Sequence, residues 1–371
     1  MTRMRSWLLN ILLGLGSLVL AIAAAEVVVR LFAPQPVGLS HQDRYGLALH
    51  YPGITRYLPQ YGHEVSFNSV GMRDREHALE KHAGTFRILL LGDSFMEAVQ
   101  VPADSMLATL MERDLTRAAG RPVEVINGGV SGWGTGDELR YLTKYGLAYH
   151  PDLVVVAMTL HNDISDNLRR DWYTVRDGVL VDRDPPPMSW FQFKVLEWKA
   201  FVATRFQLYQ IWRRVRHGRE IQQVGAALNS HVIRLFTVPS PPDIALGWQL
   251  TDRLLAAIRD ASKAAGSEMA VVLLPLRYQL ADTTFASLVK RAATPPERMA
   301  MYQPQTMIRA MADSLRIPVI DLLPAFRQWT AADKAPLYLS WDGHWNDAGH
   351  RLAADVVVHD LIDANLVPKL H

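Results

Sequence analysis

The sequence predicts an α/β fold, a three-layer α/β/α sandwich with a parallel sheet, preceded by a transmembrane helix. Short, continuously apolar segments recur along the chain, as is typical of strands buried on both faces of a sheet. Amphipathic helical segments separate them, and this alternation indicates a parallel sheet covered by helices on both faces. The first 33 residues are instead almost uniformly apolar, which predicts the membrane segment.

This N-terminal segment is long enough to cross a bilayer. Residues 6–25 are 20 uncharged residues that follow Arg3 and Arg5. A helix of this length spans about 30 Å, the thickness of the hydrocarbon core. The arginines should stay in the cytoplasm, which places the chain after residue 33 outside it. We therefore expect residues 1–33 to be an uncleaved, single-pass anchor in the inner (cytoplasmic) membrane, with the remaining chain extracytoplasmic (periplasmic).

A cleaved signal peptide is the alternative for this segment. Ala23-Ala24-Ala25 fits a small-residue cleavage site. Against cleavage, the apolar stretch exceeds the roughly 7–15 residues of a signal core. It also resumes after Glu26 as Val27-Val28-Val29, so the anchor is the preferred interpretation.

The remaining chain divides into an extension, residues 34–85, and a domain, residues 86–371. The extension is rich in Pro, Gly, His and Tyr, and Glu64–Phe67 alternates as a short strand does. In the domain, continuous apolar runs predict strands and helical spacing of apolar residues predicts helices. The predicted strands are Ile88–Leu91, Val123–Ile126, Leu153–Ala157, Met269–Leu274 and Pro318–Asp321, and the predicted helices are Asp104–Ala118, Asp137–Tyr145, Leu250–Ala265 and Ala348–Ile362.

Residues 165–245 interrupt this alternation and are predicted to be an insertion. They combine four tryptophans with a basic cluster, and their apolar residues from Phe193 to Val215 fit one face of a helix. One interpretation is a helical subdomain packed on the core. The other is an amphipathic surface that rests on the bilayer, with arginines facing the lipid headgroups. The basic cluster consists of Arg213, Arg214, Arg216 and Arg219.

Composition excludes several classes of function. The 371 residues contain 39 Lys and Arg against 37 Asp and Glu, and this net charge of +2 gives no reason to expect nucleic acid as a partner. There is no cysteine, which excludes disulfides, thiolate metal sites and a cysteine nucleophile. Nothing in the sequence identifies a protein partner.

Two segments follow the first two predicted strands, at the edge where parallel sheets bind their ligands. Gly92-Asp93-Ser94-Phe95 presents a serine hydroxyl on a tight turn, and Gly92 is expected to leave room for a substrate. Asn127–Gly132 is rich in glycine, so that its backbone N–H groups can face a developing oxyanion. Taken alone, each segment is also an ordinary turn.

Two further segments complete the predicted edge. In His161-Asn162-Asp163, after the third strand, the asparagine amide can donate a second oxyanion hydrogen bond, although a helix cap is the simpler interpretation. Asp342-Gly343-His344-Trp345-Asn346 precedes the last helix and places an acid two residues before a histidine. An acid so placed can orient a histidine base, but an isolated Asp-x-His pair can also bind a metal.

In order and placement, the four segments resemble the four blocks of the SGNH/GDSL hydrolase family. The resemblance covers roughly residues 86–165 and 268–365 and implies a flavodoxin-like sandwich. It implies Ser94 as nucleophile, His344 as base and Asp342 as the acid of the triad.

The same resemblance implies an oxyanion hole formed by the backbone amides of Ser94 and Gly132 and the side-chain amide of Asn162. Asn68-Ser69-x-Gly71-x-Arg73 also looks like bacterial membrane-anchored members of the family.

The sequence departs from the family pattern twice. His161 stands where the third block has glycine, and it either narrows the pocket or packs against a neighbour. The fourth block is usually Asp-x-x-His, whereas one residue fewer separates Asp342 from His344 here. This leaves Asp347 as an alternative acid, although a carboxylate at a helix N-terminus also serves as a cap.

The implied activity is acyl transfer from an ester, through an acyl-enzyme and without a metal or organic cofactor. Water releases the acyl group in an esterase, whereas a sugar hydroxyl receives it in an acyltransferase. The extracytoplasmic location suggests an O-acylated cell-envelope or exported polysaccharide, or a smaller acylated molecule, as substrate. Two other classes remain open. One is a catalytically silent polysaccharide-binding or scaffold protein, and the other is a metal-dependent hydrolase that uses Asp342, His344 and His350.

Overall fold

The computed structural model describes residues 2–33, 40–160, 162–170, 172–183, 186–216, 232–292 and 294–369. The chain forms two compact units. The smaller combines Met1–Arg44 with Pro187–Ala227, and the larger combines Tyr45–Pro186 with Leu228–His371.

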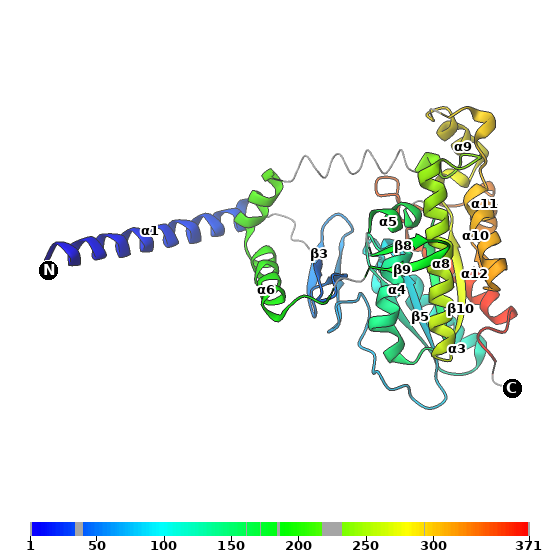
Figure 1. Ribbon diagram of the computed structural model, residues 1–371, viewed down its shortest axis with the longest axis horizontal. Helices are drawn as coiled ribbons and strands as arrows, with labels where there is room; N and C mark the ends of the chain where they lie inside the picture. Colours follow the sequence, from blue (N-terminus) through cyan, green and yellow to red (C-terminus); the bar gives the residue numbers. More distant parts are fainter. Residues whose placement is uncertain are drawn as a thin grey trace. The chain divides into compact units, whose positions relative to one another are not determined.

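The larger unit contains a five-stranded parallel sheet with the strand order β11-β10-β7-β5-β6. Strands β5 and β10 of this sheet lie among the helices of the larger unit in Figure 1. Strand β5, the first of this sheet in the chain, pairs with β6 on one side and with β7 on the other, so the strand order reverses beside β5. Ligands bind outside the carboxyl ends of the strands at such a reversal. The strands are β5 (Phe86–Gly92), β6 (Val123–Gly129), β7 (Leu153–Thr159), β10 (Glu268–Leu274) and β11 (Val319–Asp321).

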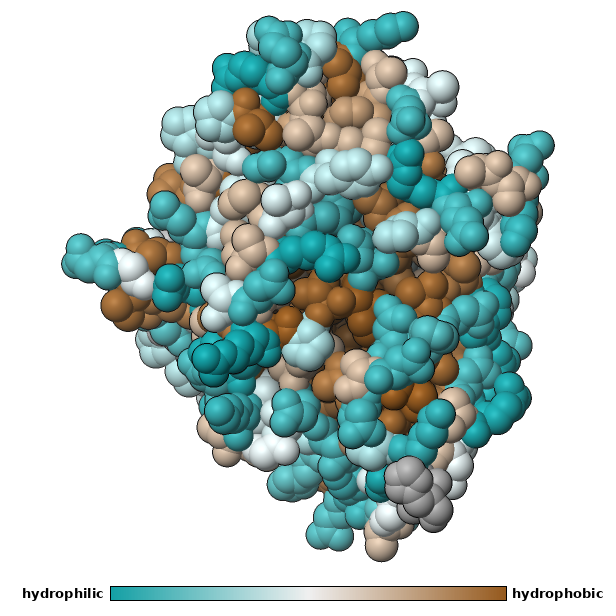
Figure 2. Space-filling view, turned by 90° about the vertical axis from the view of Figure 1, so that its right-hand side faces the viewer, coloured by the Kyte–Doolittle hydropathy of each residue, from teal (hydrophilic) through white to brown (hydrophobic). Residues whose placement is uncertain are grey.

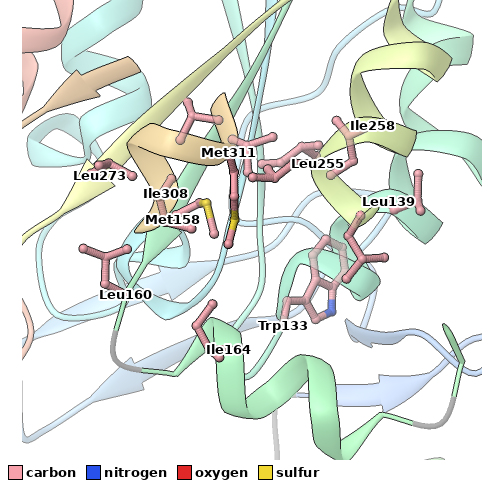
Figure 3. Packing of buried hydrophobic residues seen from close by; sticks show 14 of the residues in the cluster. Trp133, Leu139, Met158, Leu160, Ile164, Leu255, Ile258, Leu273, Ile308 and Met311 are labelled. Atoms are coloured by element: carbon pink, nitrogen blue, oxygen red, sulfur yellow. The ribbon is translucent and has the colours of Figure 1, made fainter. Parts of the chain in front are cut away.

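Helices cover both faces of this sheet because successive strand residues point to opposite sides. Ile88 and Leu90 of β5 pack with residues of α3 (Leu107–Ala119), α11 (Leu323–Ala331) and α12 (Asp347–Asp363). Leu89 and Leu91 face the opposite layer, which consists of α4 (Thr135–Lys144), α8 (Pro242–Ala264) and α10 (Gln303–Leu315). In that layer, Leu255, Ile258, Ile308 and Met311 gather near Trp133 (Figure 3). The predicted three-layer α/β/α fold is therefore confirmed.

A strand over His63–Ser66 corresponds to the one expected at Glu64–Phe67, whereas several other elements were not predicted from the sequence. The predicted helix from Asp104 begins instead at Leu107, after a 3₁₀ turn. In the larger unit the further elements are β2 (Ala48–His50), β3 (Thr55–Leu58), β4 (His63–Ser66), α2 (Ser94–Glu97), η1 (Ala103–Ser105), η2 (Gly146–Tyr149), α5 (Asp163–Arg169), β8 (Tyr173–Arg176), β9 (Val179–Asp182), η3 (Arg277–Gln279), α9 (Asp282–Val289) and η4 (Pro296–Arg298). One face carries mainly hydrophilic side chains, with apolar side chains exposed in a depression near its centre (Figure 2).

The smaller unit contains α1 (Thr2–Phe32), β1 (Ser40–Gln42), α6 (Trp190–Arg205) and a helix over residues 207–216. The segment Asn10–Phe32 of α1 has a mean hydropathy of 2.4 and is only 6% buried, so it has the length and composition of a membrane anchor or a signal sequence. The carboxylate of Glu26 accepts hydrogen bonds from the backbone amides of Gln207 (2.8 Å) and Leu208 (3.0 Å), at the start of the helix over residues 207–216. These bonds tie α1 to that helix.

The expectation of one helical face from Phe193 to Val215 is wrong. Helix α6 ends at Arg205, where Phe206 adopts an extended conformation, and a new helix starts at residue 207. The apolar residues of α6 and those of the following helix therefore do not lie along one continuous helical face. In the basic cluster, Arg219 lies outside the described residues, whereas the other three arginines are exposed.

Candidate active site

The nucleophile turn forms where β5 ends and α2 begins. Asp93 is the N-cap of α2, and its carboxylate accepts a hydrogen bond of 2.9 Å from the amide of Phe95. Ser94 is the first residue of the helix, which orients its hydroxyl at the carboxyl edge of the sheet. A side chain at Gly92 would collide with Met96. The expectation that Gly92 makes room for substrate is therefore wrong, because its missing side chain makes room for α2.

The structure brings His344 and Asp342 together with Ser94. His344 Nε2 lies 2.8 Å from Ser94 Oγ, and the other ring nitrogen, Nδ1, is hydrogen-bonded to Asp342 Oδ1. Gly343 between them has a φ of +85°, a conformation that is strained for other residues. The resulting tight turn directs both side chains toward the same place, and this explains how an acid only two residues away reaches the imidazole.

Asp347 lies apart from this arrangement, at the first position of α12. The N-cap of α12 is Asn346, whose side chain accepts a hydrogen bond of 3.0 Å from the amide of Gly349. Asp347 therefore does not cap the helix, but as an acidic residue in the first turn it faces the positive end of the helix dipole.

Tyr61, in the turn between β3 and β4, contacts the acid from its other side. Its hydroxyl donates a hydrogen bond to Asp342 Oδ2, and its ring stacks on Trp341 with 5.3 Å between the ring centroids. Burial by itself raises the pKa of Asp342, but the hydrogen bonds from His344 and Tyr61 hold that pKa below its ordinary value. Burial, together with the bond to Asp342, raises the pKa of Tyr61, so the phenol remains a proton donor. Sequence reasoning missed Tyr61, because 281 positions separate it from Asp342.

Asn162 is held beside the nucleophile turn by carboxylates. Its amide nitrogen donates to Asp93 Oδ2 at 2.9 Å and, over a longer distance of 3.3 Å, to Asp166 Oδ2. Asp93 also accepts a bond of 2.9 Å from the Thr159 hydroxyl, so its carboxylate connects the ends of β5 and β7. Burial raises the pKa of Asp166 to about 6, although nearby Arg169 favours its ionised form. His161, the predicted departure in this block, lies outside the described residues.

The amides of Ser94 and Gly132 are the other two predicted oxyanion donors. In the described part of the chain, neither N–H group donates a hydrogen bond to protein. The loop that contains Gly132 is held by the neighbouring Ser131 amide, which donates to the carboxylate of Glu97 at the end of α2. This bond links the loop to the helix of the nucleophile.

Two residues of the segment before β5 support this helix. The buried guanidinium of Arg73 donates to the carbonyls of Glu97 (3.0 Å) and Val101 (2.6 Å). His50 Nε2 lies 3.2 Å from the Glu97 carboxylate, close enough for an ion pair but without the alignment of a hydrogen bond. In the sequence, the Asn68–Arg73 motif indicated only a resemblance to membrane-anchored family members, and it did not predict these contacts.

A cleft of about 300 Å³ opens beside the imidazole of His344. Its wall includes the rings of Phe95, Tyr338 and Trp341, and Trp341 is 60% exposed. The cleft is lined by Asp342 and His344, and Ser94 Oγ lies 2.8 Å from Nε2 of that histidine.

No group of three potential ligands, whether His, Asp, Glu or Cys, is placed to hold a metal in the described ranges. His350 is buried with its ring edge-on against Trp345, and burial lowers its pKa to about 3. Asp342, His344 and His350 therefore do not form the ligand set that a metal-dependent hydrolase would use.

Several known proteins are similar to this chain. Three similar solved structures are the acetyl xylan esterase AlAXEase (15% identity over 74% of this chain and 100% of that chain, TM-score 0.41), the lipase/acylhydrolase from Enterococcus faecalis (16%, 75% and 96%, 0.41) and the acetylxylan esterase Axe2 from Geobacillus stearothermophilus (14%, 76% and 96%, 0.42). No curated protein sequence matches significantly. Residues 90–352, more than half of the chain, match the GDSL-like lipase/acylhydrolase family. The chain therefore belongs to the GDSL-like lipase/acylhydrolase family and is an ester-hydrolysing enzyme.

Proposed function

We propose that Ser94, His344 and Asp342 form a catalytic triad that cleaves O-acyl esters. The observation that carries this proposal is the 2.8 Å distance between His344 Nε2 and Ser94 Oγ, with the Asp342 carboxylate on Nδ1 of the same ring. His344 takes the hydroxyl proton as Ser94 attacks the ester carbonyl, and it later returns the proton to the leaving alcohol. Asp342 orients the ring and stabilises the imidazolium that forms.

The developing oxyanion accepts hydrogen bonds from the amides of Ser94 and Gly132, and then from Asn162. The bond of Asn162 to Asp93 is the shorter of its two bonds to carboxylates and holds the side chain in place. The longer bond to Asp166 is the one that the oxyanion replaces. Asn162 thus keeps one fixed hydrogen bond and offers the second N–H group to the transition state.

We further propose a membrane location for the protein and a class of substrate. The uncharged span of α1 after Arg3 and Arg5 supports a single-pass anchor in the inner membrane with the larger unit in the periplasm. A protein held there meets O-acylated polysaccharides of the cell envelope, which we propose as substrates. Hydrolysis and transfer to a sugar hydroxyl share the same acyl-enzyme, so only the acceptor distinguishes them.

The test of the triad is labelling of the full chain with a fluorophosphonate probe, followed by a panel of short-chain esters. Ser94→Ala should abolish both labelling and hydrolysis. Ser340→Ala is the matched control, because Ser340 lines the cleft and has no bond to a histidine among the described residues, and labelling of this variant should persist. Labelling of the Ser94→Ala protein would show that another residue is the nucleophile.

Membrane fractionation and a reporter fusion test the proposed location in the inner membrane. The protein should remain with the membrane after alkaline carbonate extraction and keep its N-terminus. A reporter fused after His371 should be active only outside the cytoplasm. A mature N-terminus at Glu26 would show that the segment is a cleaved signal.

A further inference from the structure

A second cavity adjoins the cleft at the triad. It has a volume of about 620 Å³, within the range of ligand-binding pockets. Arg277, Tyr278 and Tyr338 line both cavities, so the two cavities adjoin at these residues. Arg277 lies close to the catalytic turn, because its Nη1 is 3.9 Å from the position that a Cβ atom would take at Gly343.

Positive charge dominates this second cavity. Arg277, Arg291 and Lys334 line it, and the acidic residue beside them is Asp333. In the described ranges none of the three cations forms an ion pair with a carboxylate. Arg277 bonds to the Tyr278 hydroxyl at 3.2 Å, Arg291 bonds to the carbonyl of Ser287, and Lys334 lies over an aromatic ring. The pocket is therefore positive and its cations are available to a ligand.

The two arginines converge on one aromatic ring. The guanidinium of Arg277 lies 5.1 Å from the centroid of Tyr278, and that of Arg291 lies 5.9 Å from it. Guanidinium groups bind carboxylates and phosphates through paired hydrogen bonds. Hydroxyl-bearing and apolar side chains also line the cavity, so it offers guanidinium groups to an anion and apolar surface to the rest of a ligand.

We propose that this basic pocket, lined by Arg277, Arg291 and Lys334, binds the acidic group of an O-acylated acidic polysaccharide. The acidic group is a carboxylate or phosphate on one sugar, while the ester of a nearby sugar lies at Ser94. The exposed ring of Trp341 lines the cleft between them and offers an aromatic face to the C–H groups of the sugar. This inference rests on the proposed function, because the pocket extends the same cleft.

Binding is tested on the full-length Ser94→Ala protein in detergent, so that it does not depend on catalysis. The probes are an oligogalacturonate, a neutral galactan oligosaccharide of the same length, a sugar phosphate and inorganic phosphate. We expect the oligogalacturonate to bind at least tenfold more tightly than the neutral oligosaccharide, with an affinity that falls as salt rises. Equal affinity for both would overturn the proposal, and so would inorganic phosphate that binds as tightly as either acidic sugar.

Substitutions test whether the affinity for the acidic oligosaccharide arises from the basic pocket. Arg277→Gln combined with Arg291→Gln should remove the preference for the acidic oligosaccharide. Arg277→Lys combined with Arg291→Lys should retain part of this preference, because both substitutions keep the positive charge. Arg117→Gln with Arg253→Gln is the matched control, because these exposed arginines lie on α3 and α8, away from the pocket. An unchanged preference in the glutamine variant would refute the assignment.

The hydrolysis assay separates this inference from the triad proposal. Wild-type protein is given acetylated oligogalacturonate and an acetylated neutral oligosaccharide, and we expect kcat/KM to favour the acidic one at least tenfold. Ester hydrolysis without that preference would overturn the pocket and leave the triad intact. Tight acid-specific binding without hydrolysis of any ester would support the pocket and overturn the triad.

Discussion

Replacing Tyr61 by phenylalanine tests whether the segment before the sheet belongs to the catalytic machinery. The substitution removes the hydroxyl that donates to Asp342 but keeps the ring that stacks on Trp341. The side chain of Asp342 is only 9% exposed, so water replaces the lost donor poorly. A hydrogen bond to a charged group contributes about 1.5–3 kcal/mol, which corresponds to a fall of roughly ten- to a hundred-fold in kcat/KM.

The pH dependence gives this variant a second signature. The bond from Tyr61 is one cause of the lowered pKa of Asp342, so its loss raises that pKa. Asp342 then becomes protonated at a higher pH and no longer holds His344 as a carboxylate, which moves the acidic limb of the kcat/KM profile to higher pH. The assay is hydrolysis of a short-chain ester between pH 4 and 9.

Tyr57→Phe is the matched control for this prediction, because Tyr57 is 58% exposed and makes no contact with the triad in the described structure. Its profile should follow that of the wild-type protein. Wild-type kcat/KM and an unmoved acidic limb in Tyr61→Phe would refute the argument that Tyr61 holds the acid.

Three further predictions follow from the same site. Asp342→Asn should lower turnover by more than a hundredfold, because the imidazole loses both its orientation and its counter-charge, whereas Asp347→Asn should cost at most about 1 kcal/mol of stability and retain turnover. The opposite result in steady-state kinetics would identify Asp347 as the acid. Asn162→Ala should lower kcat by about 10²–10³, the effect of losing one oxyanion donor, and a folded variant with the wild-type rate would exclude that role. The pKa of Asp166 is raised to about 6, so protonation of this carboxyl stabilises the fold below pH 4, and this stabilisation is lost as the pH rises through 6. Asp166→Asn should therefore gain up to about 3 kcal/mol over the wild-type protein between pH 4 and 7 in urea unfolding, and parallel stability curves would contradict the shift.

The sequence by itself determined the sheet and the approximate position of the site. A strand buried on both faces must be apolar throughout, so β5, β7 and β10 are recognisable as short runs without any knowledge of their neighbours. The carboxyl ends of parallel strands meet at one edge, and for this reason Ser94 and Asn162 could be expected together. Both inferences use only local patterns and one general rule of chain topology.

Boundaries and short elements were less predictable. The expected helix at Asp104 starts later because a 3₁₀ turn precedes it, and the face from Phe193 to Val215 is divided at Phe206. The helix and strand patterns differ little over such short stretches, so contacts with the rest of the fold decide between them.

Only the tertiary structure decided how the site is supported. Tyr61 reaches Asp342, and Arg73 binds the carbonyls beside the nucleophile helix, from a segment that carries no catalytic motif. The two cavities likewise meet at Arg277, which follows a different strand from Ser94. Such contacts join residues far apart in the chain through side-chain hydrogen bonds, and these depend on how loops are folded over the sheet. No periodicity in the sequence records that placement, because loops are constrained by turns and packing rather than by a repeating pattern of burial.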